Sequence, residues 1–496
     1  MYHEGNWKVK PDLGWASISG VAGQDQGGMA AERAELLLQK MQSLREDGAS
    51  LDIHQDTQSF NIVLDCWAKS MNPSASERAL KLLREVPNPD ECSYNSVLHA
   101  MTKQTTDTET VTSAEALFEE MKGLKEKNQL SISEITFHVL MNVYGKSRHA
   151  NGATRAEQLL RGMQADGLSL NATSYNICID AYARRGDSEK AKKLLDEMVA
   201  MSEVQCRPTI HSFAAVVNAL AKSEAEDSVE QAQKIVRDVE ELDYVSPNSV
   251  LYNSLIDCIT KNGGINAPSQ AEDVLAKMRQ MHNEGHSDVH PNSYSFSMVL
   301  TCCARSQDMG AAERADRILM NMEQMYEAGH SDVIANDRCY SAVITAWARN
   351  GSTNAVQRSL ELLDRMEQNL KEHKPHGRPN AHCYNACIHA VAKSALTGSE
   401  KARKCLEILE RMVDQKEKGF HESAPTLVTY STILNGEVRD MMAEATYNEA
   451  TMSNDNIDVR VLRNFRNASP AMANKLLSDE EKSRVELPRN KLRPMI

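Results

Sequence analysis

Aromatic residues are scarce in this sequence: Phe, Trp and Tyr together make up 5% of its 496 residues. Strands of β-sandwiches and β-barrels are rich in aromatic side chains, so this scarcity argues against both folds. Gly and Pro are also few, at 23 and 14 residues, which excludes a fibrous or linker-like chain. No apolar run approaches the roughly 18 to 20 residues that cross a bilayer, so we expect no membrane partner.

Signatures of metal sites and catalysis are missing too. The eleven Cys residues include no Cys-x-x-Cys pair, and even the adjacent Cys302 and Cys303 have no second pair nearby, so we expect reduced thiols in core positions. The loose pair His282 and His286 is interrupted by Gly285, which breaks the helix that a metal site would need. Phosphate loops, Ser-centred elbows and deaminase motifs are absent. The sequence therefore predicts no enzyme, no cofactor and no metal.

The charge balance is acidic, with 69 Asp and Glu residues against 56 Lys and Arg and a net charge of −13. This sum by itself argues against a nucleic-acid partner, because binding to a phosphate backbone needs local positive charge. The distribution of the charges matters more than their sum, and it follows a repeat.

A short pattern recurs ten times: an aromatic residue, then usually a small polar residue, and an aliphatic residue or Met four positions after the aromatic. Clear copies begin at Tyr175-Asn176 and Tyr252-Asn253. Spacings of three and four residues are those of one helix face and not of a strand. The ten aromatic residues are Phe60, Tyr94, Phe137, Tyr175, Phe213, Tyr252, Phe296, Tyr340, Tyr384 and Tyr430.

A second helical pattern follows each copy, in which a small residue, two aliphatic residues and usually Met recur, as from Ala156 to Met163. Each unit is therefore expected to contain helix A, a turn, helix B and a loop. We expect the units to start at residues 57, 91, 134, 172, 210, 249, 293, 337, 381 and 427. One such unit cannot bury its apolar faces alone, so neighbouring units should stack into one all-α superhelical solenoid with a concave and a convex side.

The units resemble pentatricopeptide repeats. Residues 172–209 show it well, because Tyr175-Asn176 opens helix A, Ala183-Arg184 closes it, and Ala191 to Met198 forms helix B. The resemblance covers residues 29 to about 440 and implies a right-handed superhelix. Most units have about three extra residues between the helices, and the last four complete units add six after the Met of helix B. Insertions at one place in each unit are expected on one rim of the solenoid.

The expected organisation has three parts. Residues 1–28 form a flexible segment that does not look like a transit peptide. Residues 29–439 form the solenoid, with one orphan helix B, nine complete repeats and one partial repeat, so the chain is expected to start inside the array. Residues 440–496 are a cap or a disordered tail.

In pentatricopeptide proteins each repeat reads one base of single-stranded RNA. The resemblance implies that two side chains choose the base: the residue after the aromatic, here the reader position, and the last residue of the unit, here the cap position. Residue two of the unit stacks between bases. The implied base-binding residues are Asn61, Asp90, Asn95, Ser133, Asn176, Asn253, Asn292, Ser297, Asn336, Ser341, Asn380 and Asn385.

The family code implies a target that reads roughly U-C-x-x-x-C-A-A-y from 5′ to 3′. Two reader positions, His138 and Ala214, depart from the code. A structural explanation competes with base reading, because Asn and Ser are also favourable helix N-caps.

A basic residue stands eight positions after every reader position. These cation positions are Lys69, Lys103, Lys146, Arg184, Lys222, Lys261, Arg305, Arg349 and Lys393, with Arg439 in the partial repeat. Eight residues turn a helix by about 80° beyond two full turns, so reader and cation share one half of helix A. This predicts a basic line that binds RNA phosphates. The alternative is the helix macrodipole, which favours cations near a helix C-terminus without any ligand.

The sequence therefore predicts a monomer that binds single-stranded RNA, one base per repeat, in organellar RNA processing, stability or translation. The resemblance implies a mitochondrion or plastid, with RNA-processing or ribosomal proteins as further partners. The alternative is a protein-binding helical scaffold in an organellar ribonucleoprotein or other complex. An apolar concave groove would favour the scaffold, whereas polar readers beside a cation row favour RNA.

Overall fold

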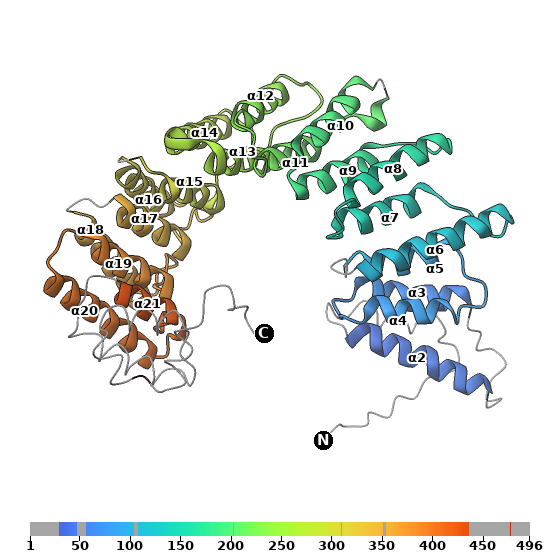
Figure 1. Cartoon of the computed structure of the whole chain (residues 1–496), viewed down its shortest axis with the longest axis horizontal. Helices are drawn as coiled ribbons and strands as arrows, with labels where there is room; N and C mark the ends of the chain where they lie inside the picture. The colour runs from blue at the N-terminus through green and yellow to red at the C-terminus, as the bar shows by residue number, and fades with distance from the viewer. Residues whose placement is uncertain are drawn as a thin grey trace. The chain divides into compact units, whose positions relative to one another are not determined.

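The computed structural model of this chain describes residues 29–46, 56–103, 108–201, 203–308, 310–350, 354–435 and 477. Twenty α-helices and three short 3-10 helices form within these ranges, and no strand does (Figure 1). The expected all-α class of stacked helix pairs is confirmed. The terminal segments 1–28 and 440–496 lie outside the described residues, apart from Leu477.

The chain divides into two compact units, Met1–Ala225 and Glu226–Ile496. A single solenoid that runs without a break through residue 225 remains a prediction. None of the described helices is long and apolar enough to cross a bilayer.

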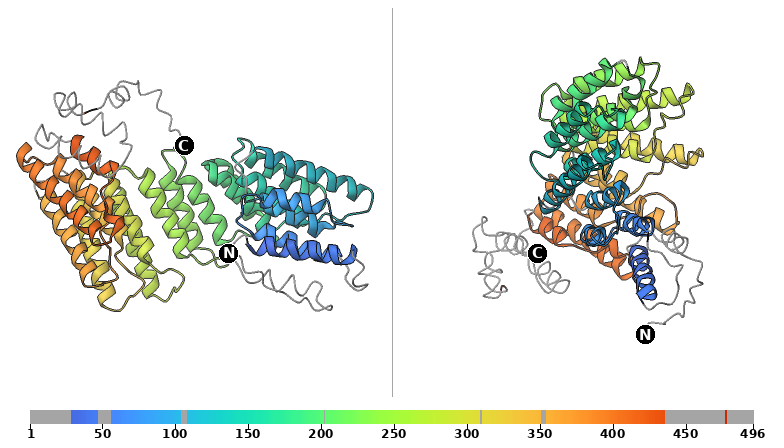
Figure 2. Two further views of the ribbon diagram at one scale, coloured as in Figure 1. Left: turned by 90° about the horizontal axis from the view of Figure 1, so that it is seen from below. Right: turned by 90° about the vertical axis from the view of Figure 1, so that its right-hand side faces the viewer.

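In the first unit, five A helices pack side by side in chain order and form one layer (Figures 1 and 2). They are α3 (Thr57–Lys69), α5 (Glu91–Met101), α7 (Glu134–Lys146), α9 (Ala172–Arg185) and α11 (Ile210–Leu220). The B helices are α2 (Met29–Glu46), α4 (Ala75–Leu83), α6 (Thr108–Glu126), α8 (Gly152–Ala165) and α10 (Ser188–Ala200), and the 3-10 helix η1 (Val204–Cys206) follows them. Helix α2 packs against α3, and its assignment as an orphan helix B stays a prediction.

The second unit repeats this arrangement. Its A helices are α13 (Ser249–Asn262), α15 (Ser293–Arg305), α17 (Asp337–Asn350), α19 (Ala381–Lys393) and α21 (Leu427–Asn435). Its B helices are α12 (Ser228–Glu240), α14 (Ala267–Asn283), α16 (Ala311–Glu327), α18 (Ala355–Lys371) and α20 (Gly398–Glu417), with the 3-10 helices η2 (Gly264–Asn266) and η3 (His421–Ser423). Each A helix packs against the next A helix in the chain, which again makes a single layer.

The repeated apolar residues form the core. Every A helix begins at the residue where the sequence places the start of a unit. All ten repeat aromatics are buried, and so are the helix B methionines such as Met163 and Met198. The Met residues therefore fill space between stacked helices, where an unbranched and adaptable side chain packs well. The eleven Cys residues are free thiols, and all except Cys92 are buried, as expected for core residues.

The extra residues of the later repeats lengthen helix B. Helices α14, α16 and α18 have 17 residues and α20 has 20, whereas α10 and α12 have 13. Gly285, Gly329 and Gly419 then turn the chain with positive φ angles of 103°, 102° and 94°, which favour glycine. The loop returns to the start of the same repeat, where the backbone N–H of Ser249 donates to the carbonyl of Asp288 at 2.9 Å.

Side-chain bridges join successive repeats. Glu367 of α18 accepts a hydrogen bond from the Tyr384 hydroxyl of α19 at 2.8 Å and another from Arg411 Nε of α20 at 3.0 Å. Near the start of the array, Glu35 of α2 likewise accepts from the indole N–H of Trp67 on α3 at 2.9 Å. Each carboxylate lies on one helix B and binds donors from the following repeat, so these bridges help to align neighbouring repeats.

Candidate nucleic-acid interface

The cap positions are the N-caps of the helices that follow them. Asp90 Oδ1 accepts from the backbone N–H of Ser93 at 2.8 Å, and Asn380 Oδ1 accepts from that of Cys383 at 3.1 Å. The same place is held by Asp90, Ser133, Asn171, Thr209, Asn248, Asn292, Asn336, Asn380 and Thr426. Capping alone therefore explains why these residues are Asn, Asp, Ser or Thr, so their composition is no independent evidence for base reading.

Reader positions lie inside helix A, and some touch the cap position of their own repeat. Asn61 Nδ2 donates to both carboxylate oxygens of Asp90 at 3.0 and 3.2 Å, and Asn176 Nδ2 donates to Thr209 Oγ1 at 3.3 Å. Burial acts to raise the pKa of Asp90, but hydrogen bonds from Ser93 and Asn61 hold that pKa below its ordinary value. The two positions that the resemblance pairs are thus in direct contact in these two repeats.

Three other readers carry a hydrogen-bond acceptor without a partner. The Oδ1 atoms of Asn95, Asn253 and Asn385 are buried and accept no hydrogen bond from the described residues. Nearly all buried polar atoms in proteins are hydrogen-bonded. A ligand donor would reach these unused acceptors only after a local movement that exposes the Oδ1 atoms.

Two serine readers are covered. Ser297 and Ser341 are only 6% and 5% exposed, and the Ser297 hydroxyl donates to the backbone carbonyl of Tyr294 in its own helix at 2.8 Å. Neither hydroxyl reaches a ligand without a local rearrangement. The assignment of these two residues to base contact stays a prediction, and it is the part of the set with least support from the geometry.

The two departures from the code also have local explanations. His138 Nε2 is 2.7 Å from Ser174 Oγ in the next repeat, and Ala214 is buried at 4% exposure. These two repeats offer no free amide at the reader position.

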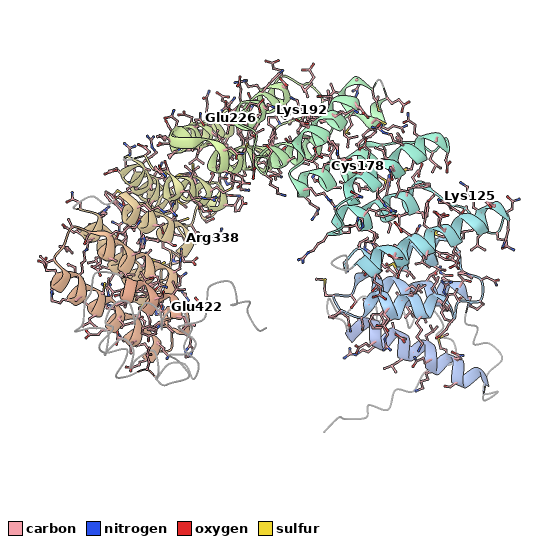
Figure 3. All side chains as sticks on the ribbon, viewed as in Figure 1. Lys125, Cys178, Lys192, Glu226, Arg338 and Glu422 are labelled. Atoms are coloured by element: carbon pink, nitrogen blue, oxygen red, sulfur yellow. The ribbon has the colours of Figure 1, made fainter. Side chains whose placement is uncertain are left out.

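Residue two of every repeat is exposed. The resemblance implies a stacking role for this position, and its fixed distance of two residues before the aromatic identifies the residues that hold it. They are Gln58, Cys92, Ile135, Thr173, His211, Val250, Tyr294, Arg338, His382 and Val428. Arg338, labelled in Figure 3, lies in the first turn of α17. Four members are large apolar side chains exposed by 55% to 61%, namely Ile135, Val250, Tyr294 and Val428.

All nine described cation positions are exposed, but their contacts differ. Lys103, Lys222 and Arg349 donate to backbone carbonyls at the end of the preceding helix A, at 3.4, 3.1 and 2.9 Å. These three contacts fit the macrodipole explanation. Four other cations lie in the last turn of their helix A, where the macrodipole also favours them, but they make neither an ion pair nor a hydrogen bond with the described residues: Lys146, Arg184, Arg305 and Lys393.

Successive cations repel one another. Partial burial and the neighbouring charge of Lys146 lower the pKa of Lys103. His99 lies on α5 between reader and cation, and its pKa is lowered by burial and then by Lys103 and Lys146. In the second unit the pKa of His389 is lowered by burial, Lys393 and Arg349. An anion beside these groups would relieve the repulsion between them.

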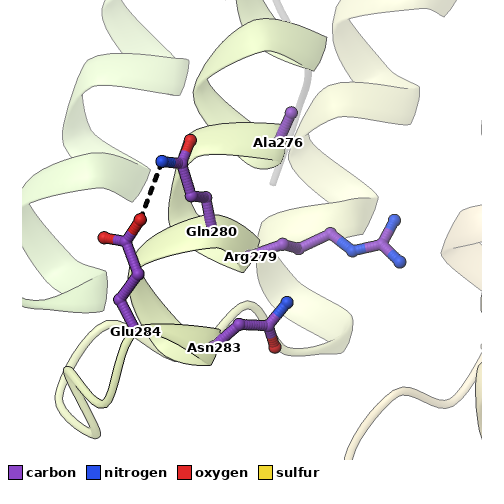
Figure 4. Close-up of a pocket in the computed structure, with 5 residues that line it drawn as sticks. All are labelled: Ala276, Arg279, Gln280, Asn283 and Glu284. Carbon is purple, nitrogen blue, oxygen red and sulfur yellow. Dashed lines mark hydrogen bonds between the residues drawn. The ribbon is translucent and has the colours of Figure 1, made fainter.

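Other kinds of site have little support. The described residues contain no group of His, Cys, Asp and Glu side chains that could hold a metal ion. A surface pocket in the second unit is lined by five residues of α14 and its C-cap, among them Arg279 and Glu284 (Figure 4). Gln280 donates to Glu284 within it at 2.8 Å. No reader, cap or cation position lines this pocket.

Similar proteins are pentatricopeptide proteins. A family model described as the pentacotripeptide-repeat region of PRORP matches residues 89–263. Pentatricopeptide repeat-containing protein At5g25630 of Arabidopsis thaliana is 29% identical over 192 residues, which are 38% of this chain and 31% of that protein. The mitochondrial pentatricopeptide repeat-containing protein At1g15480 of the same plant is 28% identical over 167 residues, 34% of this chain and 25% of that protein. The matched segments thus cover a third or less of either relative.

The fold also has a counterpart among solved structures. The crystal structure of the pentatricopeptide repeat protein PPR10 from maize resembles this chain with a TM-score of 0.51 at 18% identity, over 95% of this chain and 65% of that one. This likeness supports the arrangement of stacked helix pairs.

Proposed function

Because this chain is a pentatricopeptide repeat protein, we propose that it binds single-stranded RNA along the surfaces of its helix A layers. The observation that carries the proposal is the recurrence of three features on the nine A helices from α3 to α19. Residue two is always exposed, the reader lies three residues later on the same face, and an exposed cation follows eight residues after the reader. Stacking, base contact and phosphate contact are the three needs of single-strand binding.

We propose that the bases are read one per repeat. Asn61 with Asp90 is assigned to U. Asn95 with Ser133 and Asn253 with Asn292 are assigned to a pyrimidine, with C preferred over U. Support for the asparagines comes from their contacts with the cap position or from their unused acceptors. The assignment of Ser297 and Ser341 to A rests on the family code alone.

The cellular role follows from the relatives. Two of the similar plant proteins are named as mitochondrial. We therefore extend the proposal to organellar RNA, in a mitochondrion or plastid, whose processing, stability or translation the bound protein would control. In this proposal the chain acts by binding, as a monomer, and RNA-processing or ribosomal proteins would act on the complex.

The experiment uses the whole chain and fluorescence anisotropy with a labelled RNA that contains U-C-x-x-x-C-A-A-y. One control is a strand of the same composition with the C-A-A stretch permuted, and the other is the original strand annealed to its complement. We expect tightest binding to the unpermuted single strand. Equal affinity for the permuted strand would refute base reading. Failure to bind any of the three at low salt would refute RNA binding and favour the protein-binding scaffold.

A further inference from the structure

A third polar position recurs between reader and cation. It stands four residues after the reader and four before the cation, so all three lie along one face of helix A. We name it the middle position. It is occupied by Asp65, His99, Asn142, Asp180, Asn218, Asp257, Thr301, Thr345 and His389. Only three of these residues are acidic, so the local charge differs from repeat to repeat.

In one repeat of each unit, the acid at the middle position neutralises the cation. Lys69 Nζ lies 2.6 Å from Asp65 Oδ2 in α3, and Lys261 Nζ lies 2.6 Å from Asp257 Oδ2 in α13. The hydrogen bond to Asp65 raises the pKa of Lys69, whereas the pKa of Lys103 in the next repeat is lowered by burial and by Lys146. The two kinds of lysine thus have opposite electrostatic surroundings.

The third acid behaves differently. Asp180 lies 3.0 Å from His211 Nε2 in the next repeat, and Arg184 pairs with no acid of the described residues. Repeats whose middle residue is Asn, Thr or His keep the full charge of their cation. In the second unit these are the repeats of Arg305, Arg349 and Lys393, and in the first unit they include those of Lys103 and Lys146.

We propose that the middle position decides which repeats hold a phosphate. A phosphate that approaches Lys69 or Lys261 must displace a carboxylate and then remain beside its negative charge. Fewer counterions are released there, because the aspartate has already replaced them. Among the cations that no acid neutralises, Lys103, Lys146 and Arg184 hold the RNA backbone in one unit, and Arg305, Arg349 and Lys393 hold it in the other. This inference rests on the proposed RNA binding. It predicts that only some of the evenly spaced cations bind phosphates.

The test removes the acid without changing its shape. Asp65→Asn and Asp257→Asn are compared with the unmodified full chain by anisotropy, with the RNA named above, from about 50 to about 200 mM salt. A released phosphate contact contributes a slope of about −0.7 in log affinity against log salt for single strands. Each variant should bind the RNA more tightly at low salt. Over this salt range its affinity should fall by an additional factor of about 2.5 compared with the unmodified chain.

The reverse change adds an acid beside a free cation. Thr301→Asp places a carboxylate four residues before Arg305, and Thr301→Asn is the neutral control of nearly equal size. Thr301→Asp should flatten the salt dependence as much as Arg305→Ala does, while Thr301→Asn should leave it unchanged. Thermal unfolding of every variant checks that the fold is intact.

The outcomes separate the two proposals. If the unmodified chain binds no RNA, the proposed function fails. If it binds RNA but both Asp→Asn variants keep the original slope, or if Lys69→Ala flattens the slope as much as Lys103→Ala, only the role of the middle position is refuted.

Discussion

The exposed ring of Tyr294 offers a direct test of how RNA would lie on helix A. Tyr294 is residue two of its repeat, in the first turn of α15, and its side chain is 55% exposed. Ser297, one turn later, is covered, so in this repeat stacking is the main contact available near the reader position. Replacement of Tyr294 by Ala removes the ring and leaves the buried aromatic core of the repeat untouched.

The size of the effect follows from the exposure. Stacking of a base on an aromatic side chain is worth about 1–3 kcal/mol per base. Nearly half of Tyr294 is already covered by the protein, so the lower end of this range applies. We expect Tyr294→Ala to cost about 1 kcal/mol, which is about a fivefold loss of affinity.

Tyr244 provides the matched control. It is also an exposed tyrosine, at 42%, but it lies in the loop between α12 and α13 and not at residue two of a repeat. Tyr244→Ala should leave the affinity for single-stranded RNA unchanged, as measured by anisotropy at constant salt. Equal losses for the two variants, or no loss for Tyr294→Ala in a chain that binds RNA, would show that residue two does not stack on the bases.

Three further experiments test the stability of the stacked repeats, the protonation of His99 and the accessibility of Cys92. Glu367→Ala leaves Arg411 with Asp364 as its remaining carboxylate partner and removes the acceptor of the Tyr384 hydroxyl, and urea denaturation should show a loss of about 2 kcal/mol. Asp414 pairs with Lys418 on the surface, where its side chain is 55% exposed, so Asp414→Ala is the control, with a loss below about 0.5 kcal/mol. Bound phosphates should raise the low pKa of His99, so RNA affinity should increase as the pH falls from about 7.5 to 5.5. His99→Gln should weaken this pH dependence. If the variant keeps the pH profile of the unmodified chain, the phosphates do not lie beside His99. Cys92, at residue two of its repeat, is the exposed thiol among the described residues. Bound RNA should therefore slow the alkylation of Cys92 in the native protein. An alkylation rate unaffected by RNA would show that the strand does not cover residue two of this repeat.

Much of the fold can be predicted from the sequence because it is local. The start of each helix A is signalled by an N-cap residue four positions before an aromatic, and both the cap bond and the helix periodicity involve neighbours in the chain. For the same reason the burial of residues such as Tyr175 and Met198 follows from their spacing. The place of residue two, the reader and the cation on one face also follows from helix geometry alone.

Contacts between repeats decide the properties of the individual site residues. The sequence assigns Ser297 and Asn253 the same role, yet packing covers the Ser297 hydroxyl and leaves Asn253 with an unused acceptor. Lys103 and Lys146 look alike in the sequence, but Lys103 donates to a carbonyl of the preceding helix A. Spacing along one helix determines the direction in which a side chain leaves the backbone, whereas its exposure and its partners depend on residues that stacking brings from 30 to 45 positions away.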